Sequence, residues 1–158
     1  MKGELYADVR EDALRQWEYI FENAGWGIVV IEPRGLFMRR VNPAYARMHG
    51  YTVSELEGGP LAETLVPESR AALGRNMRIA EENGHHVYES RHIRKDGTTF
   101  PCMIDFAVLK DQHGSVVLHA AYCQDLTDRK RLEQRVLDTL KLESLGVLAA
   151  WRMISTTC

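Results

Sequence analysis

The chain lacks the features that anchor, export or cross-link a protein. Its 158 residues contain no stretch of about 18 uninterrupted apolar residues, and residues 1–17 lack the apolar segment of a secretory signal peptide. It has only three cysteines, Cys102, Cys123 and Cys158, with no CxxC spacing, which argues against a disulfide framework and a structural zinc site. The sequence therefore predicts a cytoplasmic protein with reduced thiols and no membrane-spanning segment.

An excess of charge and the common catalytic motifs are also missing. The formal net charge is −2 with both signs interspersed, so the basic surface of a nucleic-acid-binding protein or a polybasic membrane anchor is absent. No glycine-rich phosphate loop, HExxH motif or nucleophile elbow occurs, and no pair of carboxylates has a spacing that requires acid–base chemistry. We therefore expect no catalytic residue, no metal site and no nucleic-acid partner.

The chain does contain the pattern of one α+β domain with a helix on either side. Residues 1–24 hold an N-terminal amphipathic helix, whose apolar spacing begins near a capping-box-like pair, Asp8 and Glu11. Two short apolar runs follow within residues 27–41 and predict a hairpin, and residues 42–84 predict short helices broken by proline and glycine. Asn42 is the expected cap of the first of these helices.

Residues 85–125 predict a three-stranded antiparallel meander, giving five strands in all. Asp96-Gly97 is a strong hairpin signal, because a two-residue type I′ turn needs positive φ at both central positions. If Lys95 then opposes Thr98, and Lys110 opposes Ser115 in the next turn, one inward face follows for all three strands. That face carries Glu89, Arg91, Cys102, Ile104, Phe106, His119 and Cys123, with Phe106 opposite His119 and Cys102 opposite Cys123.

The last segment predicts a long amphipathic helix over residues 128–150. Its apolar positions form a broad stripe, which suits a helix in a dimeric bundle better than a narrow two-stranded seam. The stripe consists of Leu132, Val136, Leu137, Leu140, Leu145, Val147 and Leu148. We therefore expect a parallel homodimer, followed by an atypical tail over residues 151–158.

Three motifs in this order resemble the PAS domain with its C-terminal PAC segment. They are N-P-A-Y with M-H-G-Y-T at residues 42–52, R-K-D-G at residues 94–97 and D-L-T-D-R-K at residues 125–130. The resemblance covers residues 25–127 as a PAS/PAC domain and implies a five-stranded antiparallel sheet with short helices on one face. It also implies that Asp125 and Thr127, with Asp128 beside them, couple the sheet to the outgoing helix; the alternative is that Thr127 or Asp128 only caps that helix.

Residues 141–150 resemble the approach to the phospho-accepting H-box of sensor histidine kinases. The match stops at Ala150, and no acceptor histidine follows. Codons permitted for residues 151–158 encode Ala-His-Asp-Phe-Asn-Asn-Leu when read from the third base, so we hypothesise a truncated or frameshifted histidine kinase. The resemblance implies a two-component signalling role with a downstream kinase or output domain as partner.

The resemblance also implies a small-molecule site between the sheet and the short helices. A flavin adduct is not expected because no cysteine precedes Cys102, and haem is not expected because residues 69–83 contain no histidine for an axial ligand. The ligand therefore stays unidentified. The candidate pocket residues are Asn42, Tyr45, Met77, Glu89, Arg91, Ile104, Phe106, His119 and Cys123.

Other roles remain open for several of these residues. Met77 is expected to pack in the core, and His119 to be a hydrogen-bonded core histidine unless the register slips by one residue. Glu89 and Arg91 either pair with each other or contact a polar ligand. The chain as a whole is either a ligand sensor, a ligand-free dimerisation domain or a redox sensor that uses Cys102 and Cys123.

Overall fold

The structure is a computed structural model that describes residues 2–156, with side chains described from residue 11 onward. It divides into two units, Met1–Asp125 and Leu126–Cys158, which are treated separately below. The side chain of Asp8, in the predicted capping pair, and Cys158, in the predicted tail, lie outside the described residues.

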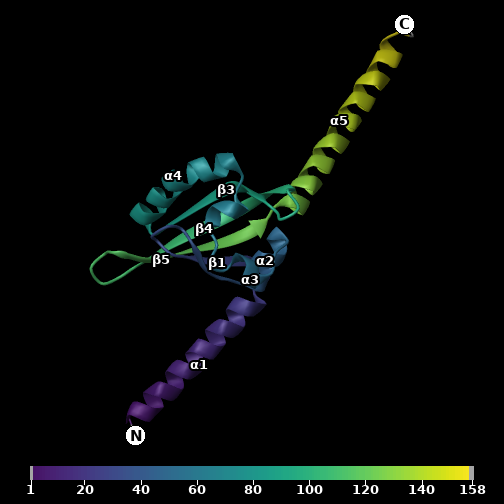
Figure 1. The fold of residues 1–158 in the computed structure, drawn as a ribbon. Coiled ribbons are helices and arrows are strands. Elements are labelled where there is room, and N and C mark those ends of the chain that lie inside the picture. Colours follow the sequence, from purple (N-terminus) through teal and green to yellow (C-terminus); the bar gives the residue numbers. More distant parts are fainter. Residues whose placement is uncertain (1, 157–158) are drawn as a thin grey trace. The chain divides into compact units, whose positions relative to one another are not determined.

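The first unit contains a five-stranded antiparallel sheet in the order β2-β1-β5-β4-β3 (Figure 1). Helix α1 spans Lys2–Asn23 and leads into the sheet. The strands are β1 (Gly27–Ile31), β2 (Met38–Val41), β3 (His85–Ile93), β4 (Thr99–Lys110) and β5 (Val116–Asp125). Between β2 and β3 lie α2 (Pro43–His49), α3 (Val53–Leu56), the 3-10 helix η1 (Leu61–Thr64) and α4 (Pro67–Asn83). The predicted α+β fold is confirmed.

The short helices begin and end where the sequence supplies capping residues. Asn42 caps α2 by accepting a hydrogen bond from the Tyr45 backbone N–H, Pro43 occupies the first turn, and Gly50 ends the helix with φ of 75°. Helix α4 likewise begins at a proline, Pro67, and ends at a glycine in the left-handed region. These capping residues limit the length of the helices, which lie over one face of the sheet.

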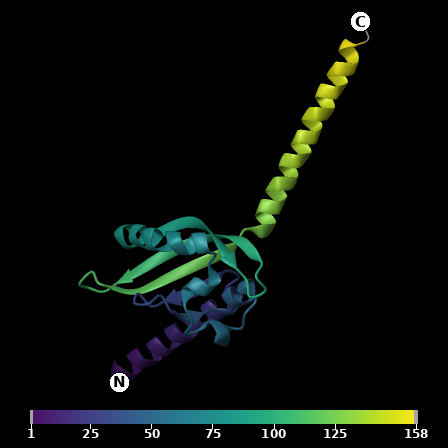
Figure 2. The same cartoon turned by 45° about the horizontal axis from the view of Figure 1, so that its top comes forward.

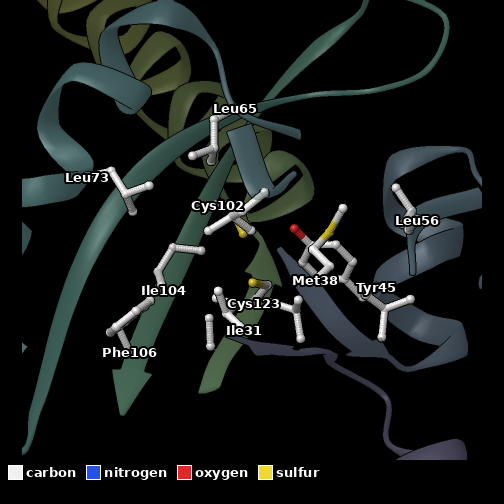
Figure 3. Close-up of a cluster of buried hydrophobic side chains, with 14 of the residues drawn as sticks. Ile31, Met38, Tyr45, Leu56, Leu65, Leu73, Cys102, Ile104, Phe106 and Cys123 are labelled. Carbon is white, nitrogen blue, oxygen red and sulfur yellow. The ribbon is translucent and has the colours of Figure 1, made fainter. Parts of the chain in front are cut away.

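The hydrophobic core lies between the sheet and this helical layer. Helix α4 runs over β3 and β4, as two views of the fold agree (Figures 1 and 2). The side chains of the core come from both layers, and Figure 3 shows part of the cluster. Its most buried large members are Val29, Ile31, Met38, Val41, Tyr45, Leu56, Phe100 and Phe106.

The β3–β4 hairpin has a register one residue away from the predicted one. The Arg94 N–H bonds to the Thr98 carbonyl at 2.8 Å, so the loop has three residues and only its last, Gly97, has positive φ. A type I′ turn needs two such residues; a three-residue loop with its glycine in the left-handed region is the next common solution. This one-residue shift exchanges the two faces of β3 relative to the prediction. Glu89 and Arg91 are exposed, and Tyr88 and His92 face the core.

The β4–β5 pairing is shifted by two residues, which preserves the predicted face. His119 is opposite Val108 rather than Phe106, and Cys123 is opposite Ile104 rather than Cys102. The Asp111 N–H bonds to the Ser115 carbonyl at 2.9 Å, and a bulge lies between Leu109 and Lys110. Since side chains alternate with period two, His119 and Cys123 stay inward, as predicted.

Substituting Gly50 by alanine is expected to destabilise the first unit by about 1 kcal/mol. Gly50 has φ of 75°, while a Cβ there would meet only ordinary contacts with Lys95, so the cost comes from the backbone alone. Gly74→Ala, inside α4 with no atom near its added Cβ, is the matched control and should stabilise by roughly 0.5 kcal/mol. Urea denaturation measures both; equal shifts for the two variants would contradict the argument.

The second unit is dominated by α5, which spans Thr127–Ser155. The helix therefore continues past the predicted end at Ala150. None of its described side chains is buried, and the predicted apolar stripe is exposed on it. Among the described residues, no helix combines the length and the apolar character required to cross a bilayer.

Candidate functional site

A small cavity lies inside the core, between the sheet and the helical layer. Its volume is about 20 Å³, enough for roughly one water molecule. Polar groups reach it from Tyr45, Tyr88, His92 and Cys123 among aliphatic and aromatic side chains. The lining residues are Val29, Tyr45, Leu61, Leu65, Leu73, Tyr88, His92, Ile104, Phe106, Ala121 and Cys123.

Four of the predicted pocket residues, Tyr45, Ile104, Phe106 and Cys123, line this cavity together. The hydroxyl of Tyr45 lies 2.9 Å from Thr64 Oγ1, whose own hydroxyl donates to the Leu61 carbonyl. Burial raises the pKa of the Tyr45 phenol far above its usual range, so this hydroxyl stays protonated. The cavity is thus apolar with a few fixed neutral polar groups.

The other predicted pocket residues lie elsewhere. Met77 packs partly buried against the core, as expected for a methionine at helical spacing. Glu89 and Arg91 are exposed on the opposite sheet face, where Arg91 donates to Thr99 Oγ1 at 2.9 Å, so their placement in the pocket was wrong. Asn42 is fully buried, but it holds backbone groups rather than lining the cavity.

His119 is buried beside Glu81 of α4. Its exposure is 1%, and its Nε2 lies 3.2 Å from Glu81 Oε1 while Nδ1 has no hydrogen-bond partner among the described residues. Burial lowers the pKa of His119, against the opposing effect of Glu81. A neutral ring that donates from Nε2 to the carboxylate, with the Nδ1 lone pair buried, fits this geometry.

A pair of buried histidines adjoins the cavity and was missed by the sequence reasoning. His49 Nε2 and His92 Nδ1 are 2.8 Å apart, and His49 Nδ1 lies 2.8 Å from the Tyr45 carbonyl oxygen. Burial lowers the pKa of His49 to about 4 and that of His92 to about 3. The one-residue slip of β3 is what brings His92 inward.

Arg94 connects α2 to the end of β5. Its guanidinium bonds to Asp125 Oδ2 at 2.9 Å, donates to the Met48 carbonyl and lies 3.9 Å from the ring centroid of Phe100. Both charged groups are about one-quarter exposed, so the ion pair is partly shielded from water. Arg94 was noted in the R-K-D-G motif, but nothing in that motif alone indicated its partner.

The predicted coupling residues stand at this end of β5. Asp125 is the last residue of the strand and pairs with Arg94, whereas Thr127 is the first residue of α5. Leu126 occupies the cap position, with no capping bond from a side chain. Asp128 lies in the first turn of α5, where a negative charge stabilises the helix by its interaction with the positive end of the helix dipole.

Cys102 and Cys123 are both buried free thiols, and their sulfurs lie in the same core cluster (Figure 3). They occupy diagonal rather than opposite positions, since Cys102 faces Asp125 across the ladder. Diagonal neighbours have Cα atoms about 7 Å apart, beyond the range usual for disulfides. A hydrogen bond with Cys102, together with burial, raises the pKa of the Cys123 thiol.

We expect neither thiol to form a disulfide when folded protein is treated with a mild oxidant. The diagonal geometry and the protonated state of Cys123 both oppose the reaction. Mass spectrometry of a Cys158→Ser variant, with iodoacetamide after unfolding, should find two free thiols. The redox sensor would instead be supported if both free thiols disappeared on oxidation and reappeared with reductant. The Cys102 thiol should then stay free in Cys123→Ala.

Curated proteins similar to this chain are sensors. It is 26% identical over 141 residues to the methyl sulfide methyltransferase-associated sensor of Methanosarcina acetivorans, covering 88% of this chain and 14% of that protein. It is 21% identical over 145 residues to the sensor histidine kinase TmoS of Ectopseudomonas mendocina, covering 86% and 15%. The chain thus spans about one-seventh of the length of these relatives.

The fold is found in solved structures as well. The crystal structure of a PAS domain from Colwellia psychrerythraea superposes with a TM-score of 0.68 at 23% sequence identity, covering 73% of this chain and 98% of that one. The sequence model of the PAS domain family matches residues 27–128, which include the whole sheet and its helical layer. The chain belongs to the PAS domain family.

Proposed function

We propose that this chain is the signal-input and dimerisation module of a two-component sensor histidine kinase. A change in the core, caused by a small ligand or a protein partner, alters the Arg94–Asp125 contact and through it the helix that follows Asp125. An output kinase reads the altered helix. The sensor histidine kinase relative supports this assignment.

The observation that carries the proposal is the position of Arg94. One side chain contacts the carbonyl end of α2, the aromatic core through Phe100, and the last residue of β5. Movement of α2 relative to the sheet must therefore break or reorient one of these contacts. An ion pair at the end of a strand is a two-state contact that a ligand can bias, provided that the ligand prefers one state.

Hydrogen exchange of the full chain tests this coupling. We expect Arg94→Leu to raise the exchange rates of the backbone amides in the first turns of α5 by about tenfold, because the ion pair between Arg94 and Asp125 is lost. Arg91→Leu, which removes an exposed arginine from β3, is the matched control and should leave these exchange rates unchanged. Equal effects of both variants would refute coupling through Arg94.

The homodimer is tested separately by sedimentation equilibrium. The exposed stripe on α5 includes Leu137, Leu140 and Leu145, each more than half exposed, and a second copy would cover them. We expect a dimer at micromolar concentration and a monomer for Leu140→Glu. A monomeric parent chain at high micromolar concentration would count against the proposal.

The size of the cavity favours a second candidate, a ligand-free PAS domain that senses through a protein partner. A cavity of about 20 Å³ accepts little more than water without rearrangement. Native mass spectrometry of freshly purified protein separates the two: a bound metabolite supports the ligand sensor, and a bare chain supports the alternative. Sequencing the coding DNA across residues 151–158 tests the proposed frameshift of the H-box.

A further inference from the structure

Two buried imidazoles lie between the core cavity and the Arg94–Asp125 ion pair. His92 lines the cavity, and both His49 and His92 are at most 3% exposed. The ring of Phe100 contacts both, with centroid distances of 5.2 Å and 5.7 Å, and the Arg94 guanidinium lies over that same ring. The pair therefore adjoins the cavity at His92 and shares the Phe100 ring with Arg94.

The hydrogen bonds of the pair allow only one neutral tautomer for each ring. The Tyr45 carbonyl oxygen only accepts, so His49 Nδ1 carries the hydrogen and its Nε2 carries a lone pair. His92 Nδ1 must then donate to His49 Nε2, since the two atoms are 2.8 Å apart. Both hydrogen bonds are thus donated in the same direction, from His92 to His49 and from His49 to the Tyr45 carbonyl. His92 Nε2 keeps a lone pair.

We infer that His92 and His49 are positioning residues that form a directional hydrogen-bond relay from the cavity to the carbonyl end of α2. This inference rests on the proposed sensory function and specifies how it works. A hydrogen-bond donor that meets His92 Nε2 leaves the relay intact. An acceptor requires a hydrogen on Nε2, so both neutral rings must change tautomer, and the lone pair of His49 Nδ1 then faces the Tyr45 carbonyl.

That second arrangement loosens the end of α2. Repulsion between the His49 lone pair and the carbonyl oxygen displaces the last turn, whose Met48 carbonyl receives the Arg94 hydrogen bond and whose His49 carbonyl receives the Lys95 N–H at 2.9 Å. The relay therefore distinguishes donor ligands from acceptor ligands and passes the difference to Arg94 and Asp125.

Side-chain ¹⁵N NMR of the unmodified full chain at neutral pH tests the relay first. We expect His49 and His92 both to carry hydrogen on Nδ1, and His119, the buried control, to carry it on Nε2 beside Glu81. Exposed His113 should show a mixture of tautomers. An Nε2–H tautomer at either His49 or His92 would overturn the inference, whatever the outcome of the coupling experiments.

Transmission is tested with a change at the cavity, Tyr45→Phe, which removes the hydroxyl but keeps the carbonyl. We expect this change to alter amide exchange at Asp125 and in the first turn of α5 by about threefold or more. The effect should vanish in a His92→Leu background and return in His92→Asn, because the asparagine amide replaces the Nδ1–H donor.

The outcomes separate the relay from the proposed function. An effect of Tyr45→Phe that persists in His92→Leu would overturn the relay and leave coupling between core and α5 intact. If neither Tyr45→Phe nor Arg94→Leu, each made in the parent chain, changes amide exchange in α5, both the relay and the proposed coupling are overturned. If His92→Leu does not fold, the tautomers of the unmodified protein still decide the inference.

Discussion

Asn42→Ala is expected to lower the free energy of unfolding of the PAS domain by about 4 kcal/mol. The Asn42 amide makes four hydrogen bonds: it accepts from the Ile28 and Tyr45 N–H groups at 2.8 and 2.9 Å, and donates to the Phe21 and Trp26 carbonyls at 3.1 and 3.0 Å. It thus joins the end of α1, the start of β1 and the start of α2. Alanine leaves all four backbone groups without this partner, and three of the four bonds are buried and the fourth partly buried.

Urea denaturation followed by circular dichroism measures this effect. Asn23→Ala is the control, because Asn23 makes one exposed side-chain bond, to the Tyr19 carbonyl, and should cost less than about 1 kcal/mol. Asn42→Asp keeps both acceptor roles but buries a charge and loses both donors, so it should be as damaging as alanine. A loss below about 1 kcal/mol in Asn42→Ala would mean that water replaces the amide.

Acidification is expected to destabilise the domain steeply between about pH 6.5 and pH 4. Burial is the main cause that lowers the pKa values of His49 and His92 to about 4 and 3; Arg94 adds to it at His49 and Asp125 opposes it at both. In this interval the unfolded chain binds protons at both residues and the folded chain does not, so stability falls as pH falls. The loss from pH 7 to pH 4.5 is on the order of 4 kcal/mol.

Urea midpoints measured across this pH range test the prediction. A double variant, His49→Leu with His92→Leu, should flatten most of the slope, and the remainder should come from His119, whose pKa is also lowered by burial. His113→Gln, at an exposed position, should leave the slope unchanged. A parent protein that is equally stable at pH 7 and pH 4.5 would show that the pair is hydrated.

The sequence was sufficient to predict the strands, the short helices and the PAS fold, because caps, turns and alternating apolar residues are local signals. It also predicted that His119 and Cys123 face inward, since the two-residue shift of the β4–β5 ladder changes neighbours but not faces. The inward side of β3 could not be predicted. It depends on whether the 94–98 turn has two or three loop residues, and Asp-Gly is compatible with both.

The same ambiguity concealed part of the candidate site. With Glu89 and Arg91 placed inward, His92 pointed to solvent and could not meet His49 across the core. The alternation of His86, Tyr88, Ser90 and His92 on β3 was the available signal, and it competed with an equally plausible one from Val87 and Ile93. The Arg94–Asp125 contact joins residues 31 positions apart, and no local pattern encodes such a pair.

The three-residue loop Lys95-Asp96-Gly97 sets the phase of the edge strand. If the same sequence closed this turn with only Asp96 and Gly97 in the loop, which Asp-Gly also permits, Lys95 would pair with Thr98 and every β3 side chain would rotate to the other face. Ile93 would then replace His92 opposite Phe100, Glu89 and Arg91 would face the core, and His49 of α2 would lose its histidine partner. Loop length at this turn, rather than the identity of any core residue, thus determines which kind of polar group the domain places at its centre.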